Sequence, residues 1–151
     1  PRLELAEKFG ATRTINVEEE DVVEVVRRET NGEMCDVVVD VSGNPNAIVK
    51  SVDCLHRQST MVLGGLTGDT TVTPMLMDKL VWNEIKLQGC FTADNDATEA
   101  ALRIIEETKF PVQEMVSHVF PLKEIEHCIR AIGGEVPGTF PTKALINPAI
   151  G

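Results

Sequence analysis

Three apolar segments of the sequence end in glycines or small residues, and binding chemistry is expected at these ends. A glycine lets a ligand approach the backbone closely, because it has no side chain, and the hydroxyl of Ser42 adds a hydrogen-bond donor. A nucleotide lying across the ends is one interpretation, and a set of tight turns without a ligand is the other. The three ends, in chain order, are Val41-Ser42-Gly43, Leu63-Gly64-Gly65 and Gly89-Cys90-Phe91-Thr92.

The histidines and cysteines show no recognisable catalytic or metal-binding pattern. Cys54 with His56, and His127 with Cys128, do not have the spacing of zinc ligands, and residues this close on a helix point in different directions. Cys90 is the cysteine nearest the candidate binding edge, where a small apolar filler is the expected role. We therefore predict no catalytic residue and no metal ligand in this chain.

Residues 36–66 contain the elements that must position these ends. Val37, Val38 and Val39 are consecutive β-branched residues without polar alternation, which predicts a strand covered on both faces, as in a parallel sheet. Asn44 is the expected N-cap of the next helix, with Pro45 in its first turn. A second buried strand then leads to Gly64-Gly65. In open α/β sheets, ligands bind beyond the carboxyl ends of such strands.

The remaining elements follow from similar patterns. Asp21 with Glu24, and Asp96 with Glu99, resemble capping boxes that begin two further helices. Strands alternate with helices through about residue 92, which predicts βαβ units in a parallel α/β fold. The other predicted helices are 2–9, 75–80 and 122–132, and the other predicted strands are Thr12–Val17, 85–88, 116–120 and 143–146.

Composition limits the possible partners and location. The chain has 151 residues, of which 42% are hydrophobic, and a net charge of −10, which argues against a nucleic-acid backbone as partner. No apolar stretch is long enough to span a membrane. Four cysteines without paired spacing suggest reduced thiols and a cytoplasmic protein. The chain begins at Pro1 without an initiating Met, so we expect it to be the middle of a longer protein.

The order of these motifs resembles the second half of a medium-chain dehydrogenase, and the zinc-dependent alcohol, sorbitol and threonine dehydrogenases are the most similar members. The resemblance covers nearly the whole chain. The motifs that carry it are RLELAEKFGA, TRTINV, CDVVVDVSGNPNAIVKSVDCL, TMVLGGL, IKLQGCF, PLKEIEHCIRAI and KALINP.

The resemblance implies a partial Rossmann fold. The family's cofactor domain has six strands in the order 3-2-1-4-5-6, of which this chain would carry strands 3 to 6, including Thr12–Val17 as strand 3. Without strands 1 and 2, strand 3 would lose its neighbours, so we expect Thr12–Val17 to pair elsewhere or to be poorly ordered. Residues 1–120 would form an incomplete dinucleotide-binding domain, and residues 121–151 would return to a catalytic domain that is absent here. The glycine-rich phosphate loop and the zinc ligands of the family would also lie outside this chain.

The resemblance also implies the site residues and partners. The cofactor would be NAD or NADP, and zinc would be bound only in the full-length protein. Subunits would pair near Leu80 to Leu87 as a homo-oligomer, either a dimer or a tetramer. The residues implied in cofactor binding are Val41, Ser42, Gly43, Leu63, Gly64, Gly65, Cys90 and Thr92, with Lys143 near the pyrophosphate.

The implied function is the cofactor-binding part of an NAD(P)-dependent dehydrogenase that transfers hydride between an alcohol or polyol and the nicotinamide. The full-length protein would be the enzyme, and this chain alone is expected to be inactive. Two alternatives stay open from the sequence. One is a zinc-free quinone or enoyl reductase of the same superfamily, and the other is a non-enzymatic nucleotide-binding module.

Overall fold

The computed structural model describes residues 1–150, which form two compact units. One unit is Ile15–Ala93, and the other combines Pro1–Thr14 with the chain from Asp94 onward. None of the helices in the described residues has the length and apolar character needed to cross a membrane.

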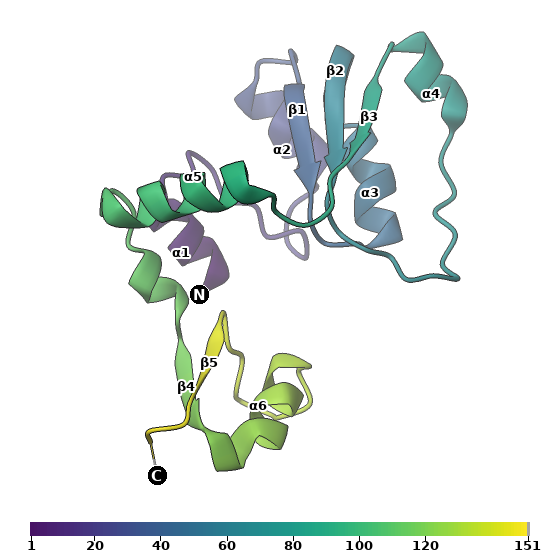
Figure 1. The fold of residues 1–151 in the computed structure, drawn as a ribbon. Helices are drawn as coiled ribbons and strands as arrows, with labels where there is room; N and C mark the ends of the chain where they lie inside the picture. Colours follow the sequence, from purple (N-terminus) through teal and green to yellow (C-terminus); the bar gives the residue numbers. More distant parts are fainter. Residues whose placement is uncertain (151) are drawn as a thin grey trace. The chain divides into compact units, whose positions relative to one another are not determined.

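The first unit is built around a three-stranded parallel sheet. Its strands are β1 (Cys35–Asp40), β2 (Leu55–Leu63) and β3 (Lys86–Gly89), with β2 in the middle (Figure 1). Helix α3 (Pro45–Val52) connects β1 to β2, and helix α4 (Met77–Trp82) precedes β3. The predicted parallel α/β fold is confirmed, with the third strand shifted by one residue from its expected start.

Helix α3 begins where the sequence predicts. The Asn44 side chain accepts hydrogen bonds from the backbone N–H groups of Asn46 and Ala47, and Pro45 occupies the first turn. These bonds satisfy two of the N–H groups that have no partner inside the helix. The chain therefore turns sharply at the end of β1 and runs back across the sheet.

The core of this unit lies on one face of the sheet. Met61 of β2 has an exposed fraction of 0%, and burying such a side chain contributes about 1.5–3 kcal/mol. Val38 of β1 is half-buried against this cluster. The buried members of the cluster are Ile48, Val52, Leu55, Met61 and Leu80.

The opposite face of the sheet corrects one prediction. The valine run was expected to be covered on both faces, but Val37 and Val39 are 56% and 60% exposed. Side chains alternate along a strand, so these two point away from the face that carries the core. In the part of the chain that the structure describes, burial of β1 is therefore one-sided.

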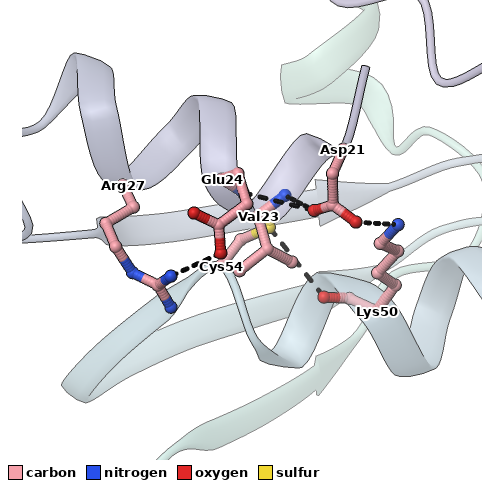
Figure 2. A network of polar contacts seen from close by, with 6 residues as sticks. All are labelled: Asp21, Val23, Glu24, Arg27, Lys50 and Cys54. Carbon is pink, nitrogen blue, oxygen red and sulfur yellow. Dashed lines mark hydrogen bonds and ion pairs between the residues drawn. The ribbon is translucent and has the colours of Figure 1, made fainter. Parts of the chain in front are cut away.

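Helix α2 (Val22–Glu29) is joined to α3 by polar contacts. Asp21 caps α2 by accepting bonds from the backbone N–H groups of Val23 and Glu24, as predicted, and its Oδ2 lies 2.8 Å from Nζ of Lys50 (Figure 2). The hydrogen bond from Lys50 lowers the pKa of the Asp21 carboxyl. Glu24 pairs with Arg27 in the next turn. One side chain thus begins a helix and links it to its neighbour.

Thr12–Val17 does not form the predicted strand. The segment is irregular, with a bend at Thr12 and a turn at Val17. A strand needs a neighbour to receive its backbone N–H and C=O groups, and no strand pairs with these residues in the described part of the chain. Thr12–Val17 is therefore not a strand, as expected for a segment without its neighbouring strands, and the other three predicted strands of the family sheet are present as β1, β2 and β3.

The second unit joins the beginning of the chain to its later part. The Phe9 ring, just after helix α1 (Arg2–Lys8), stacks on Phe110 with centroids 5.9 Å apart, and Nζ of Lys8 lies 2.5 Å from a carboxylate oxygen of Glu114. The elements of this unit after α1 are α5 (Asn95–Glu106), a 3₁₀ turn at Val112–Met115, β4 (His118–Pro121), a 3₁₀ turn at Leu122–Glu124, α6 (Ile125–Ile132) and β5 (Ala144–Asn147). Strands β4 and β5 pair in parallel, and α6 packs against both of them (Figure 1).

One detail of this unit differs from expectation. Helix α5 is capped by Asp94, whose side chain accepts a bond from the N–H of Ala97 at 2.8 Å, and not by Asp96. The compact units divide at residues 14–15 and 93–94, because contacts such as Phe9 with Phe110 join distant parts of the sequence. The division of family domains at residue 120 stays a prediction.

Candidate functional site

The predicted site residues of the first unit gather at the carboxyl edge of the sheet. Asp40 pairs with Leu63 in the register of β1 and β2, and Leu63 pairs with Gly89 in that of β2 and β3. The three strands therefore end level with one another. This register brings together the ends at Val41-Ser42-Gly43, Leu63-Gly64-Gly65 and Cys90.

Asp40 organises the turn after β1 through its side chain. Its Oδ1 accepts hydrogen bonds from the N–H of Ser42 at 3.1 Å and from the N–H of Gly43 at 3.2 Å. The Ser42 hydroxyl donates to Oδ2 at 2.9 Å and accepts a bond from the N–H of Asn44 at 3.1 Å. The carboxyl group is almost fully buried, since Asp40 is only 7% exposed. Asp40 was not among the residues predicted from the sequence to bind the cofactor.

The same residue holds the neighbouring turn through its main chain. The carbonyl oxygen of Asp40 accepts hydrogen bonds from the N–H of Gly64 at 2.8 Å and from the N–H of Gly65 at 3.3 Å. Asp40 thus bonds to four backbone amides in two turns. The same strand also contains Asp36, so no local sequence signal distinguished Asp40.

The glycines at this edge are required by contacts between the two turns. A Cβ atom added to Gly65 would lie 2.2 Å from the backbone N of Gly43, and one added to Gly43 would lie 2.2 Å from the carbonyl oxygen of Leu66. Gly43 also has φ of 64°, which favours glycine. The turns therefore interlock, and this contact explains both glycines without a ligand.

Gly64 has a different environment. A Cβ atom there would meet only Cγ1 of Val41 at 3.5 Å and the Asp40 carbonyl oxygen at 3.7 Å, which are ordinary van der Waals distances. Val41 itself is 76% exposed. Among the described residues, none donates a hydrogen bond to the carbonyl oxygens of Gly64 and Gly65. The edge thus presents an apolar side chain beside backbone acceptors.

The end of β3 adds Cys90 and Thr92. The N–H of Cys90 donates to the carbonyl oxygen of Leu63 at 2.9 Å, so Cys90 continues the pairing with β2. Thr92 has φ of 59°, an uncommon conformation for a β-branched residue. Both residues are exposed. Their backbone lies at the same edge as Gly64.

Lys143 belongs to the other unit, immediately before β5. Its side chain is exposed, and its carbonyl oxygen accepts a bond from the N–H of Ser117 at 3.0 Å. The proximity of Lys143 to a pyrophosphate stays a prediction.

Within residues 1–150, no group of three or more His, Cys, Asp or Glu side chains is placed to hold a metal ion, so the described residues do not fit the family's zinc.

Comparison with known proteins gives concordant results. A family profile described as zinc-binding dehydrogenase matches residues 1–107. An L-threonine 3-dehydrogenase of Caldanaerobacter subterraneus subsp. tengcongensis is 34% identical over 127 residues, which cover 83% of this chain and 36% of that protein. An erythritol/L-threitol dehydrogenase of Mycolicibacterium smegmatis is 31% identical over 128 residues, which cover 83% of this chain and 34% of that protein.

A solved structure shares the fold. The crystal structure of an alcohol dehydrogenase from Thermotoga maritima superimposes with a TM-score of 0.85 at 21% identity, covering 97% of this chain and 40% of that one. The chain spans about a third of the length of the two curated relatives named above. The family match extends over most of the sequence, and the resemblance noted from the motifs is confirmed. The chain belongs to the zinc-binding dehydrogenase family.

Proposed function

We propose that this chain binds the nicotinamide side of NAD or NADP, as part of a dehydrogenase that acts on an alcohol or polyol. The observation that carries the proposal is the level carboxyl edge formed by β1, β2 and β3. Ligands of open α/β sheets bind beyond this edge. The relatives are dehydrogenases by name, and the whole protein's activity, its substrate and its location in the cytoplasm are parts of the same proposal.

The chemistry of the edge supports a nicotinamide ligand. The amides of Ser42, Gly43, Gly64 and Gly65 are bound by Asp40, so the edge offers mainly carbonyl acceptors. A carboxamide NH₂ group is a donor for such acceptors. The exposed Val41 side chain supplies an apolar surface for a flat ring. These residues bind and orient, while the cofactor itself supplies the hydride chemistry when bound.

A calorimetric titration of the chain with NADH and with NADPH tests the proposal. Binding of either nucleotide is the expected result. The variant Val41→Glu should remove the binding heat, because it places a charge beside the proposed ring position. No heat with either nucleotide would contradict the proposed function.

A matched control comes from the strand that precedes Val41. Val37 is an exposed valine of β1 that lies four residues before Val41. The variant Val37→Glu should bind the nucleotide as the wild type does. Equal loss of binding in both variants would show that a charge on β1 disturbs the sheet generally.

We also propose that copies of the chain associate through α4 and β3. Val81 and Trp82 of α4 are 71% and 74% exposed, and Leu87 of β3 is 42% exposed. Leu80, which was expected to take part, is instead buried in the core. These exposed apolar side chains support a contact with another subunit.

Light scattering coupled to size exclusion tests this association. The wild-type chain should elute as a dimer or larger species, and Trp82→Glu should shift it toward the monomer. Val72→Glu is the control, since Val72 is also highly exposed but precedes α4 in a loop. A wild-type chain that is monomeric at all concentrations would rule out the contact.

A further inference from the structure

We propose that Asp40 is a positioning residue, which sets the geometry of both cofactor-facing turns through hydrogen bonds to their backbone. The inference rests on the proposed function, because it concerns the edge at which the nucleotide would bind. The observation behind it is that the carboxyl group of Asp40 is buried at the end of β1, directly after three consecutive valines.

The side-chain half of this arrangement fixes the first turn. Oδ1 of Asp40 accepts hydrogen bonds from the backbone N–H groups of Ser42 and Gly43, and Oδ2 accepts one from the Ser42 hydroxyl at 2.9 Å. Gly43 thereby holds its φ of 64°. Bonds to a charged acceptor are stronger than bonds between neutral groups. Removing the carboxyl group leaves two backbone amides and one hydroxyl without their acceptor.

The main-chain carbonyl of Asp40 holds the second turn, at Gly64 and Gly65, close to the first. The Asp40 carbonyl oxygen binds the amides of Gly64 and Gly65. Because these turns interlock with no room for a Cβ atom at Gly65, a shift of the first turn moves the second. One residue therefore determines where Val41 lies relative to the carbonyl oxygens of Gly64 and Gly65.

The other aspartate of β1 shows that this role is specific to position 40. Asp36 lies near the opposite end of the strand, with a side chain that is 94% exposed and paired with His56. It has the same chemical group on the same strand, and no contact with either turn is found in the described residues. Asp36→Asn is therefore the matched control for changes at Asp40.

The test combines nucleotide affinity with amide hydrogen exchange in the 151-residue chain. Asp40→Ala should raise the NADH dissociation constant about tenfold, as expected for lost bonds to a charged group. The amides of Ser42 and Gly43 should exchange faster. The amide of Gly64 should stay protected, because its acceptor is the main-chain carbonyl, which alanine retains.

Asp40→Asn is the conservative variant that should restore binding. Its amide oxygen can still accept both N–H groups, and its NH₂ group can donate to the Ser42 hydroxyl. We expect affinity close to the wild type from Asp40→Asn and unchanged affinity from Asp36→Asn. A role confined to stability would instead lower the melting temperature of Asp40→Ala and leave the affinity of the folded protein unaltered.

Two results would overturn the inference. One is an Asp40→Ala chain that binds NADH with wild-type affinity. The other is equal loss of affinity in Asp40→Asn and Asp40→Ala while the amides of Ser42 and Gly43 stay protected, which would indicate a charge effect. A wild-type chain that binds neither NADH nor NADPH overturns the proposed function instead, and amide exchange alone then decides whether Asp40 orders the first turn.

Discussion

The two ends of the three-stranded sheet are held together in different ways. At the carboxyl end, one residue binds the backbone amides of two turns, and glycines allow those turns to interlock. At the amino end, long side chains pair across the strands. His56 binds Asp36 at 2.9 Å, and Glu84 binds both Arg57 and Gln58.

Polar contacts also hold residues with positive φ at the amino end. Gln58 and Glu84 at the amino end have φ of 64° and 52°, without being glycine. The N–H of Gln58 donates to Asn83 at 2.7 Å, and its side chain donates to Glu84 at 2.7 Å, so polar contacts hold the strained residues. The comparison indicates that the amino end is closed by contacts within the chain, whereas the carboxyl end keeps backbone acceptors and an apolar side chain exposed.

The largest effect is expected where the two turns interlock. Gly65→Ala places a Cβ atom 2.2 Å from the backbone N of Gly43, so the backbone must move. We expect it to lower the free energy of unfolding by about 3 kcal/mol, at the upper end of the usual range for overpacking. Chemical denaturation monitored by circular dichroism measures this change.

Gly89 provides the control for that variant. It ends β3 at the same edge, and a Cβ atom there would meet nothing within 4 Å. Gly89→Ala should alter the free energy of unfolding by less than about 1 kcal/mol. If the two variants were equally destabilised, the close contact between Gly65 and Gly43 would not explain the effect of Gly65→Ala.

Cysteine reactivity should also distinguish the two ends. Burial raises the pKa of Cys54 at the amino end from 9.0 to about 11, so about a hundredfold less thiolate is present than for an ordinary thiol. Cys90 at the carboxyl end is exposed. We expect Ellman's reagent to label Cys90 at least about a hundredfold faster, and bound NADH to slow this labelling. Comparison with Cys90→Ser assigns the fast phase, and similar rates at both sites would contradict the difference in burial.

A smaller loss is expected from the bulge in β2. The register between β1 and β2 shifts near its start, and Ser59 there is buried, with its hydroxyl donating to the carbonyl oxygen of His56 at 2.6 Å. Ser59→Ala should lower the free energy of unfolding by about 1–2 kcal/mol, because the carbonyl oxygen of His56 loses the hydrogen bond from the buried hydroxyl.

Ser51→Ala is the matched change for that experiment. It removes the same atom from a half-buried site on helix α3, where alanine has the higher helix propensity. It should not lower stability. If Ser59→Ala were as stable as Ser51→Ala, the bulge would not depend on its side-chain bond.

Local patterns predicted the elements better than their surroundings. Asn44 was identified as a cap because capping depends on residues two and three positions ahead. The valines of β1 were correctly placed in a strand, but the exposure of Val37 and Val39 was not foreseen. The pattern of apolar residues in a strand shows which side chains favour burial. Whether they are buried depends on which other segments pack against that face of the sheet. Thr12–Val17 failed as a strand for the same reason.

The candidate site was predicted as a set of strand ends, without the residue that organises it. Ser42, Gly43, Gly64 and Gly65 are found together at one edge, as parallel strands require. The hydrogen bonds of Asp40 to these residues depend on three-dimensional geometry. A strand pattern alone gives no reason to separate this carboxyl group from that of Asp36.

The smallest expected effect concerns the pH dependence of the His56–Asp36 pair. The hydrogen bond that His56 donates to the Asp36 carboxylate is the main cause of both shifts: it raises the pKa of His56 above its usual 6.5 and lowers the pKa of Asp36 below 3.8. The His56 contribution to stability is complete below 6.5 and is lost as pH rises through the raised folded-state value. The Asp36 contribution is present above 3.8 and is lost as pH falls through the lowered value.

The pair therefore stabilises the amino end only in the acidic to neutral range between these limits. Asp36→Asn should reduce stability in this range and match the wild type in alkaline solution, above the raised pKa of His56, where the imidazole is neutral in both proteins. Urea denaturation across pH, with an NMR titration of the His56 ring, measures the effect, which is small because the pair is exposed. A stability difference that persisted unchanged in alkaline solution would show that Asp36 acts through something other than charged His56.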